Sequence, residues 1–329
     1  MHGTSTRRGE LRVGHTFTLR RGGSLLSPQI GYEITGPEGA PVLLAMGGIS
    51  ATRHVCSSAA YPESGWWEDF AGPGKSLDTL RFRVLGMDFL GGNDQTQGPR
   101  LQDEPFPSVD PEDQARLLAE LMDLLSIPRL HGFFGASYGG MVALQFAALF
   151  PEKLEKLVVV GATHRPPAIA TALRCVQREA IRRCQGLGDA AEGLRIARAI
   201  GMVTYRSAQE FEQRFSAEPA SRDGRLAFEV QDYLFSRGDD FARRFLPEAV
   251  LCLSESIDLQ QLEPERIRVP AELLCASSDF VAPPELMMEL SRRIAAPCRY
   301  TQYESFYGHD SFLKEVELLG AHFKRILDT

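Results

Sequence analysis

The sequence predicts an α/β protein in which helices flank a mostly parallel sheet and an all-helical insertion interrupts the sheet-forming part of the chain. Short apolar segments of strand length alternate with helical segments in the first half of the 329 residues. Strand-like runs are missing between residues 168 and 263, and they return after Val269-Pro270. We therefore expect a core built from residues 1–167 and 264–329, with residues 168–263 forming a helical lid.

The first half supplies most of the expected strands. Residues 41–46 and 82–87 are apolar runs that end in glycine-rich turns, as buried strands of parallel sheets do. Residues 111–125 carry apolar side chains at helical spacing, with Asp110 as the N-cap and a proline in the first turn. The next elements are expected in the order strand 130–134, helix 141–150 and strand 157–160. Strands separated by helices predict a parallel sheet that is covered on both faces.

The second half changes character and then returns to the first pattern. Arginine- and alanine-rich helical stretches follow one another from residue 168 to residue 263. Beyond them, strands are expected at residues 271–276 and 298–303, followed by an amphipathic helix that ends near Leu327. The last strands therefore extend the same sheet, and the helical segment is an insertion in it.

Composition and charge exclude several classes of protein. Hydrophobic residues make up 43% of the chain and charged residues 24%, which is typical of a globular enzyme and excludes a disordered chain. Asp and Glu number 43 against 36 Lys and Arg, so the net charge of −7 predicts neither a nucleic-acid nor a membrane partner. The six cysteines are dispersed without a C-x-x-C pair, so we expect no metal site and a reducing, cytoplasmic location.

The strongest chemical signal is a G-x-S-x-G motif at residues 135–139, between an expected strand and an expected helix. A sharp strand-to-helix turn needs glycine on either side, because a larger side chain would clash with the neighbouring backbone. Such a turn exposes the hydroxyl of Ser137 at the helix N-terminus, where partial positive charge stabilises a developing anion. An incidental serine in a glycine-rich turn is the alternative, but the strand, the helix and the partners below favour a nucleophile.

A serine nucleophile needs a histidine base that is held by an acid. In α/β enzymes with this turn, the chain order is nucleophile, acid, histidine. His309 lies downstream of Ser137 and of a suitable acid, in a loop after a late strand. Asp279 follows the strand at 271–276 and is preferred to Glu285, which falls in the next helix. The other histidines fit less well: His2 and His15 are N-terminal, His131 precedes the nucleophile, His54 and His164 lie in loops that can border the pocket, and His322 lies in the last helix.

The tetrahedral intermediate of acyl transfer needs two N–H donors for its oxyanion. The backbone N–H of Tyr138, directly after the nucleophile, is one candidate. The second is the N–H of Gly48, in the loop after the strand at 41–46, where glycine lets the backbone approach a substrate. A tight turn without a catalytic role is the alternative interpretation of Gly47-Gly48.

Several stretches of the sequence resemble the homoserine O-acyltransferase family, whose acetyl- and succinyl-transferring members have the α/β-hydrolase fold. The similarity extends over residues 30–320. TYRS at 204–207 and GHDSFL at 308–313 are much more specific to this family than the nucleophile motif is. The other similar stretches are GWWEDFAGPGKSLDT at 65–79, FLGG with a later GP at 89–99, GASYGGMVALQFA at 135–147, VQREAI at 176–181, FEVQDYL at 228–234 and SSDFVAPP at 277–284.

The resemblance implies a role for each residue and a reaction. Ser137 matches the family's acylated nucleophile, Asp279 its acid and His309 its base. Arg206 in TYRS matches the arginine that binds the acceptor's carboxylate, and Asp310 matches the acid that receives the acceptor's ammonium group. The implied reaction is ping-pong transfer of an acetyl or succinyl group to the hydroxyl of L-homoserine, in methionine biosynthesis. It implies acyl-CoA as co-substrate, no permanently bound cofactor, and a homodimer.

The sequence departs from this family where the substrates would bind. The oxyanion loop reads MGGIS instead of an Ala-Leu-Thr-Gly segment, residues 246–253 lack an asparagine, and SDFVAP replaces a more aromatic version. Acetyl and succinyl donors both remain candidates, with Arg53 near Gly48 as a candidate partner for a succinyl carboxylate. L-serine or a specialised hydroxyl compound is an alternative acceptor, and an esterase or a non-catalytic binding protein is an alternative function. Four arginines are expected on a solvated helical face, with CoA phosphates as their alternative partners: Arg174, Arg178, Arg182 and Arg183.

Overall fold

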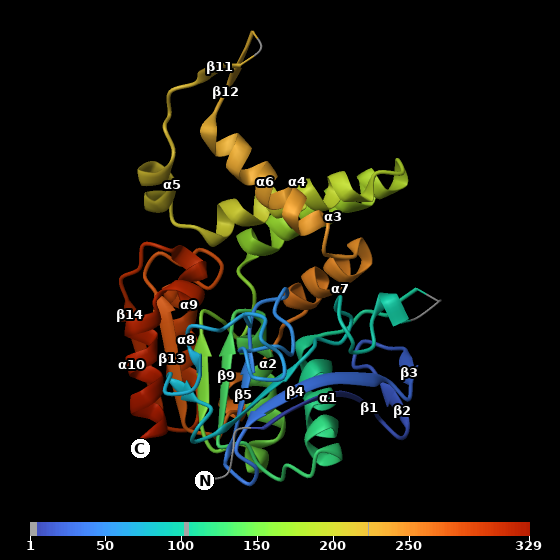
Figure 1. The fold of residues 1–329 in the computed structure, drawn as a ribbon, viewed down its shortest axis with the longest axis vertical. Helices are drawn as coiled ribbons and strands as arrows, with labels where there is room; N and C mark the ends of the chain where they lie inside the picture. Colours follow the sequence, from blue (N-terminus) through green and yellow to red (C-terminus); the bar gives the residue numbers. More distant parts are fainter. Residues whose placement is uncertain (1–4, 102–104, 223) are drawn as a thin grey trace.

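The computed structural model describes residues 5–101, 105–222 and 224–329, and its centre is an eight-stranded sheet (Figure 1). The strand order is β1-β4-β8-β5-β9-β10-β13-β14, and from β8 to β14 all neighbouring strands are parallel. β4 runs antiparallel to both of its neighbours. The strands are β1 Ser5–Arg12, β4 Gln29–Gly36, β5 Val42–Met46, β8 Arg83–Met87, β9 Gly132–Ala136, β10 Leu157–Val160, β13 Ala271–Ala276 and β14 Cys298–Tyr303.

The expected mostly parallel sheet is confirmed, and all six strands predicted from apolar runs are present in it. The sequence analysis did not identify β1 and β4. Strand β1 reads STRRGELR, which has a single apolar side chain, so its pairing with β4 rather than its own hydrophobicity places it in the sheet. In the described part of the chain, three short pairs lie outside the main sheet: β2 Thr16–Thr18 with β3 Ser24–Leu26, β6 Ala71–Gly72 with β7 Leu77–Asp78, and β11 with β12 in the insertion.

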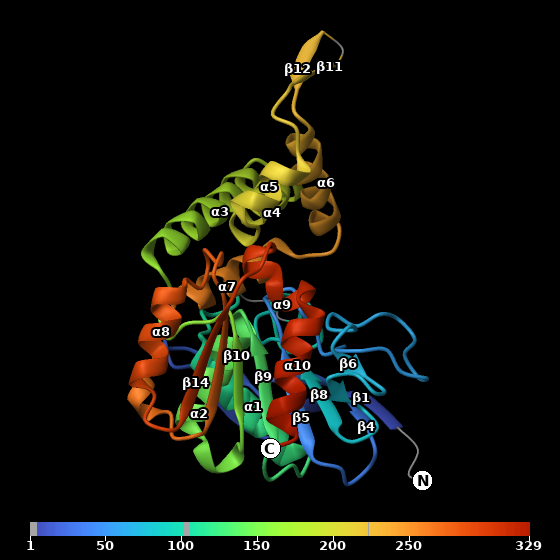
Figure 2. The same ribbon diagram turned by 90° about the vertical axis from the view of Figure 1, so that its left-hand side faces the viewer.

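Helices cover both faces of the sheet, as Figure 2 shows. Successive strand residues point to opposite faces, so Leu44 and Met46 pack in one hydrophobic cluster while Leu43 and Ala45 pack in the other. The first cluster includes residues of α1, α2 and α8, and the second includes residues of α10. These helices are α1 Pro111–Leu124, α2 Tyr138–Leu149, α8 Pro284–Arg293 and α10 Val316–Leu327, with α9 Ser311–Lys314 just before α10.

The insertion forms a separate layer beyond the carboxyl ends of the parallel strands (Figures 1 and 2). Its helices are α3 Ala168–Gly186, α4 Ala190–Tyr205, α5 Ala208–Arg214, α6 Glu229–Ala242 and α7 Pro247–Asp258. The structure differs from the expected all-helical insertion at one point, because β11 Ala220–Arg222 and β12 Arg225–Ala227 form an antiparallel hairpin. Gly224 in the turn has a positive φ of 75°, which favours a tight reversal over a continued helix.

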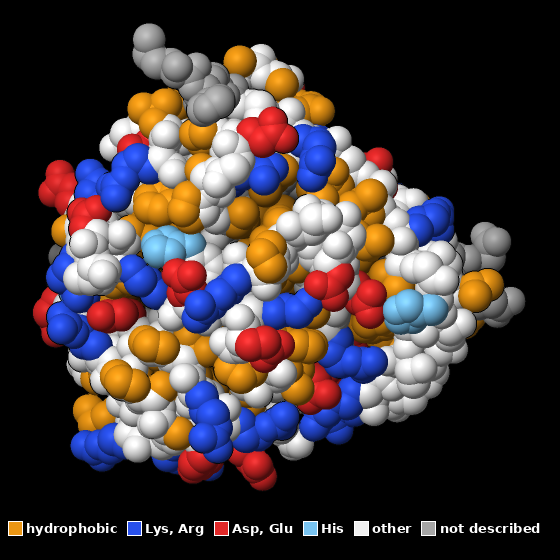
Figure 3. Space-filling view, turned by 90° about the horizontal axis from the view of Figure 1, so that it is seen from below, with side chains coloured by type: hydrophobic (Ala, Val, Ile, Leu, Met, Phe, Trp, Pro, Cys, Tyr) orange, Lys and Arg blue, Asp and Glu red, His pale blue; other side chains and the backbone are white. Residues whose placement is uncertain are grey.

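The surface away from the lid has mixed charge. On the face seen from below, acidic and basic side chains are interspersed rather than gathered by sign (Figure 3). Among the helices of the described residues, none is both long and apolar enough to cross a membrane.

Candidate active site

Ser137 occupies the sharp turn between β9 and α2. Its backbone has φ 53° and ψ −122°, a strained conformation for a residue with a side chain, and its N–H donates to the carbonyl of Val160 at 3.0 Å. A Cβ atom on Gly135 would lie 2.5 Å from the carbonyl oxygen of Gly139, and one on Gly139 would lie 2.2 Å from that of Met46. Both flanking positions therefore require glycine, and the turn holds the hydroxyl at the N-terminus of α2.

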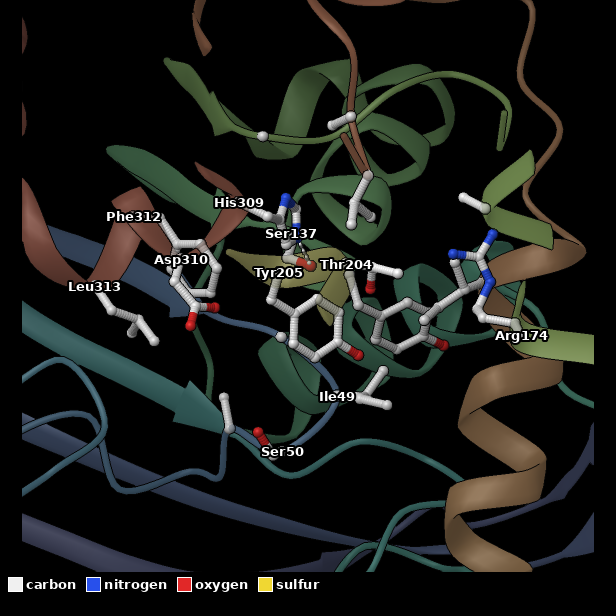
Figure 4. A pocket seen from close by; sticks show the side chains of 18 of the residues that line it. Ile49, Ser50, Ser137, Arg174, Thr204, Tyr205, His309, Asp310, Phe312 and Leu313 are labelled. Carbon is white, nitrogen blue, oxygen red and sulfur yellow. Dashed lines mark hydrogen bonds between the residues drawn. The ribbon is translucent and has the colours of Figure 1, made fainter. Parts of the chain in front are cut away.

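The structure brings Ser137 together with the predicted base, as Figure 4 shows, and with the predicted acid behind that base. The Oγ of Ser137 lies 2.8 Å from Nε2 of His309, and Nδ1 of His309 lies 2.8 Å from Oδ2 of Asp279. The other oxygen of Asp279 accepts hydrogen bonds from the N–H groups of Val281 and Ala282, both at 2.8 Å. These backbone donors fix the carboxylate, the carboxylate places the proton on Nδ1, and Nε2 is left to accept the serine proton.

The electrostatic setting of His309 suits a general base. Burial alone lowers the pKa of His309, but the Asp279 carboxylate raises it, and the resulting pKa lies above the ordinary histidine value. Burial raises the pKa of Asp310, with the charges of Arg206 and His309 acting in the opposite direction. His309 therefore gains affinity for a proton in the enclosed site, as removal of a proton from Ser137 requires.

The two residues expected to donate backbone N–H groups to the oxyanion lie next to Ser137. Tyr138 is the first residue of α2, so its N–H has no carbonyl partner within the helix. A Cβ atom on Gly48 would lie 3.9 Å from Oγ of Ser137, which places this glycine backbone beside the nucleophile. The carbonyl of Gly47 accepts the N–H of Gly139 at 2.7 Å and so anchors the loop to the turn. Gly48 and Tyr138 can thus form an oxyanion hole.

A cavity of about 210 Å³ lies above Ser137, with walls from both the core and the insertion. The core contributes the oxyanion loop, Trp66, the triad histidine and Asp310. The insertion contributes Ala170, Leu173, Arg174 and Gln177 of α3, Arg198, Thr204 and Tyr205 of α4, and Ile257 of α7. The insertion therefore roofs the nucleophile and limits its contact with water.

The two residues expected to bind a zwitterion form an ion pair at one side of this cavity. Nε of Arg206 lies 3.2 Å from Oδ2 of Asp310, and Nη1 of Arg206 donates to Glu210 at 2.6 Å. Asp310 lines the cavity, whereas Arg206 lies behind it and is not part of the lining. The N–H at Nε is buried and makes no hydrogen bond to any described residue. A cation and an anion are thus side by side next to His309, and the Nε of Arg206 that faces Asp310 is not aligned for a hydrogen bond to it.

Comparisons with known proteins agree with this geometry. The alpha/beta hydrolase fold family matches residues 41–316. The chain is 33% identical to a serine O-succinyltransferase of Litchfieldella anticariensis, over 91% of this chain and 92% of the relative. It is 38% identical to a homoserine O-succinyltransferase of Xanthomonas campestris pv. campestris, over 95% of this chain and 82% of the relative. The chain belongs to the homoserine O-acyltransferase family.

Solved structures support the fold of this acyltransferase. A homoserine O-acetyltransferase from Bacillus anthracis has a TM-score of 0.87 at 22% identity, covering 98% of each chain. An acetylester hydrolase from Corynebacterium glutamicum has a TM-score of 0.81 at 13% identity, covering 98% of this chain and 96% of that one. The predicted α/β-hydrolase fold is confirmed, and because it is common to transferases and hydrolases, the residues of the site must indicate the reaction.

Two glycines of the acyltransferase support the triad, and the sequence analysis did not single them out. Gly161 follows β10 with φ 59°, and a Cβ there would lie 3.1 Å from Oδ2 of Asp279. Gly308 has φ 58°, and a Cβ there would lie 2.8 Å from the backbone nitrogen of Ser207. The loop that carries His309 is therefore in backbone contact with the end of the TYRS segment. This contact brings TYRS at 204–207 and GHDSFL at 308–313 together at one site, although about 100 residues separate them in the sequence.

The structure corrects three expectations about charged residues of the acyltransferase. Arg174 and Arg178 are not on a solvated face: both are 8% exposed and bind Asp258. Arg182 and Arg183 are exposed, as expected. Arg53 does not line the cavity and is not available to a succinyl carboxylate there, because it binds Glu10, Asp88 and the carbonyl of Gly9.

The loop histidines lie outside the cavity of the acyltransferase. His54 is paired with Glu33, and its Nε2 lies 2.8 Å from the carbonyl of Glu63. His164 is paired with Glu289 at 3.2 Å. Among the described residues, no group of three His, Cys, Asp or Glu side chains is arranged to hold a metal ion.

Proposed function

We propose that this acyltransferase moves an acyl group from a CoA thioester to the side-chain hydroxyl of L-homoserine through an acyl-serine intermediate. The observation that carries the proposal is the Arg206–Asp310 pair beside the triad, with Asp310 in the wall of a roofed cavity. A simple esterase has no need for a cation and an anion next to its base. A free amino acid carries both charges, and binding both would orient its hydroxyl toward an acyl-enzyme.

The first half-reaction follows from the positions of the three reacting groups. His309 takes the proton of Ser137, and Oγ of Ser137 attacks the thioester carbonyl carbon. The N–H groups of Gly48 and Tyr138 donate to the oxyanion that forms. Collapse breaks the C–S bond, His309 returns the proton to the leaving thiolate, and free CoA departs. The acyl group is then esterified to Ser137.

The second half-reaction uses the same base. The acceptor's ammonium group binds Asp310, and its carboxylate pairs with the guanidinium of Arg206, which lies directly behind Asp310 and turns toward the cavity for this contact. His309 removes the acceptor's hydroxyl proton, and the oxygen attacks the acyl-serine carbonyl. Collapse restores Ser137, which takes the proton back from His309. The roof from the insertion favours this transfer over hydrolysis, because it keeps water away from the ester.

The names of relatives support an amino acid with a side-chain hydroxyl as the acceptor, and they leave homoserine and serine as the two candidates. One relative is named for homoserine and another for serine, and both are named for a succinyl donor. We propose homoserine first, as a step of methionine biosynthesis, with serine as the alternative acceptor. We also propose a cytoplasmic homodimer with no resident cofactor. The exposed apolar side chains of Ile169 and Val176 on α3 suit a contact between copies of the lid.

The decisive experiment measures CoA release and protein mass together. The protein is mixed with acetyl-CoA or succinyl-CoA, with and without homoserine or serine. We expect an acyl adduct on the peptide that contains Ser137 when no acceptor is present, and rapid thiol release once an acceptor is added. Thiol release at the same rate with and without an acceptor would identify a hydrolase instead. The Ser137→Ala variant is the control and should form no adduct.

A further inference from the structure

A small recess opens off the active-site cavity on the lid side, between α3, α4 and α7. It has a volume of about 30 Å³, which is enough for a small polar group. Six residues line both spaces, so the recess is continuous with the cavity: Ile49, Arg174, Gln177, Arg198, Tyr205 and Ile257. Ile49 directly follows Gly48, and the recess therefore begins one residue from an oxyanion donor.

The recess carries an excess of positive charge. Three arginines line it, namely Arg174, Arg178 and Arg198, and no Asp or Glu is among its lining residues in the described part of the chain. The carboxylate of Asp258 lies 2.6 Å from both Arg174 and Arg178, so a single negative charge is shared by two guanidinium groups. A partly buried site with this imbalance favours a bound anion.

Arg198 is the arginine of this recess that has no carboxylate partner among the described residues. Its guanidinium lies over the ring of Phe241 at 5.0 Å and near the ring of Tyr205 at 5.6 Å. These aromatic faces hold the group in place and leave its N–H donors free. The ring of Tyr205 lies in turn 6.1 Å from the ring of His309, so one aromatic side chain separates Arg198 from the catalytic base.

We propose that this recess binds the distal carboxylate of a dicarboxylic acyl group of the succinyl type, with Arg198 as its main donor. This inference rests on the proposed function and adds the class of donor. Ile49 lines both the cavity and the recess, so an acyl chain attached to Ser137 can extend along it from the cavity into the recess. An acetyl group ends in a methyl and has no use for a cation there. A succinyl group ends in a carboxylate, which matches the unpaired guanidinium.

The acceptor uses a different part of the cavity. Figure 4 shows Asp310 and Arg174 on opposite sides of the Ser137–His309 pair. Arg206 belongs to the Asp310 side, where it is already paired with Asp310 and Glu210. The acceptor's ammonium group and the acyl carboxylate therefore have different direct partners, Asp310 and Arg198, although the charge of Arg198 is close enough to Asp310 to oppose the rise in pKa that burial causes at that carboxyl.

The test compares two donors on matched variants. Initial rates are measured with succinyl-CoA and acetyl-CoA, at saturating acceptor, for the unmodified enzyme, Arg198→Met, Arg198→Lys and Arg195→Met. Arg195 is one turn away on α4, pairs with Glu192 and Asp239, and does not line the recess, so it controls for loss of a lid arginine. Arg198→Met should lower kcat/KM for succinyl-CoA by about 10- to 100-fold. Its kcat/KM for acetyl-CoA should stay within about threefold of the value for the unmodified enzyme. Arg198→Lys should recover part of the loss.

Three outcomes would overturn the inference while leaving the proposed function intact. The first is an equal loss of kcat/KM for succinyl-CoA and acetyl-CoA in Arg198→Met. The second is a rise in the acceptor's KM in that variant with both donors. The third is a higher kcat/KM of the unmodified enzyme for acetyl-CoA than for succinyl-CoA. If Arg198→Met does not fold, the test uses Arg198→Lys, in which kcat/KM for succinyl-CoA should fall relative to kcat/KM for acetyl-CoA. Absence of an acyl adduct on Ser137 with either donor would instead overturn the proposed function itself.

Discussion

The catalytic end of the core and the lid above it are stabilised in different ways. Ser137, Asp279 and His309 are positioned by strand ends and by backbone hydrogen bonds, between two large hydrophobic clusters. The lid has one small apolar cluster of its own, formed by Ile181, Leu194, Ala197 and Phe241. The buried charged side chains of the lid, Arg174, Arg178 and Glu210, are all in ion pairs. The core can therefore hold reacting atoms rigidly, whereas the lid presents charged groups that select substrates.

The contacts between these two regions include apolar packing of Leu253 against the core and two directional polar contacts. The hydroxyl of Tyr138 lies 2.6 Å from that of Ser256 on α7, and Ser207 donates to the carbonyl of Phe306 at 2.5 Å. Tyr138 is also the residue after the nucleophile. The lid is thus attached to the backbone of the active site itself. We expect core substitutions to abolish the chemistry, and lid substitutions to change which substrates are used.

The largest effect should come from the nucleophile. Ser137→Ala removes the atom that accepts the acyl group, and no other hydroxyl replaces it beside His309. We expect kcat to fall by about 100,000-fold or more. Circular dichroism and thermal unfolding should match the unmodified protein, which shows that the fold is kept. Retained turnover would mean that the core does not supply the chemistry.

The next largest effect should come from the triad acid. Asp279→Asn keeps the shape of the side chain but no longer stabilises the proton on Nδ1 of His309, and we expect kcat to fall by about 1,000- to 10,000-fold. Neutral His309 is the active form, so the rate rises with pH through a pKa above the usual 6.5. Loss of the carboxylate removes what raises that pKa, so the midpoint of the pH–rate profile should move to lower pH. Glu285→Gln, an exposed neighbour on α8, is the control and should leave the profile unchanged.

A substitution in the lid should separate the half-reactions. Arg206→Lys keeps the charge but loses the planar fork that reaches Glu210 and the acceptor, and kcat/KM for the amino acid should fall by about 10- to 100-fold. Formation of the acyl adduct on Ser137, followed by mass spectrometry, should be unchanged. Arg214→Lys is the matched control, because Arg214 also binds Glu210 but is 43% exposed at its side chain. Slower formation of the acyl adduct in Arg206→Lys would show that this lid residue also affects the acylation of Ser137.

The smallest effect should come from the contact between the two regions. Ser256→Ala removes one partner of the Tyr138 hydroxyl, which keeps its hydrogen bond from Gln114. We expect the free energy of unfolding to fall by about 1 kcal/mol, measured by chemical denaturation. Ser291→Ala, whose hydroxyl bonds only within α8 at 2.9 Å to Met288, should change it by less than about 0.5 kcal/mol. Equal effects would mean that the Tyr138–Ser256 contact does not stabilise the lid.

The sequence by itself determined the elements whose signals are local. Six strands could be predicted from apolar runs, and the turn at Ser137 from two glycines that are four positions apart. Asp279 and His309 could be placed because chain order restricts where the acid and base of this fold occur. Strand β1 could not be predicted, since its pairing partner rather than its own side chains defines it.

Only the tertiary structure decided which arginines face the cavity. Arg174 and Arg178 looked like solvated helix residues, yet Asp258, about 80 positions away, lies against both. Arg53 lies near the oxyanion loop in sequence, but Asp88 and Glu10 hold it elsewhere. A backbone turn is specified by a few adjacent residues, because sterics act over one or two peptide units. The environment of a charge depends on partners from distant segments, and these meet only when the chain has folded.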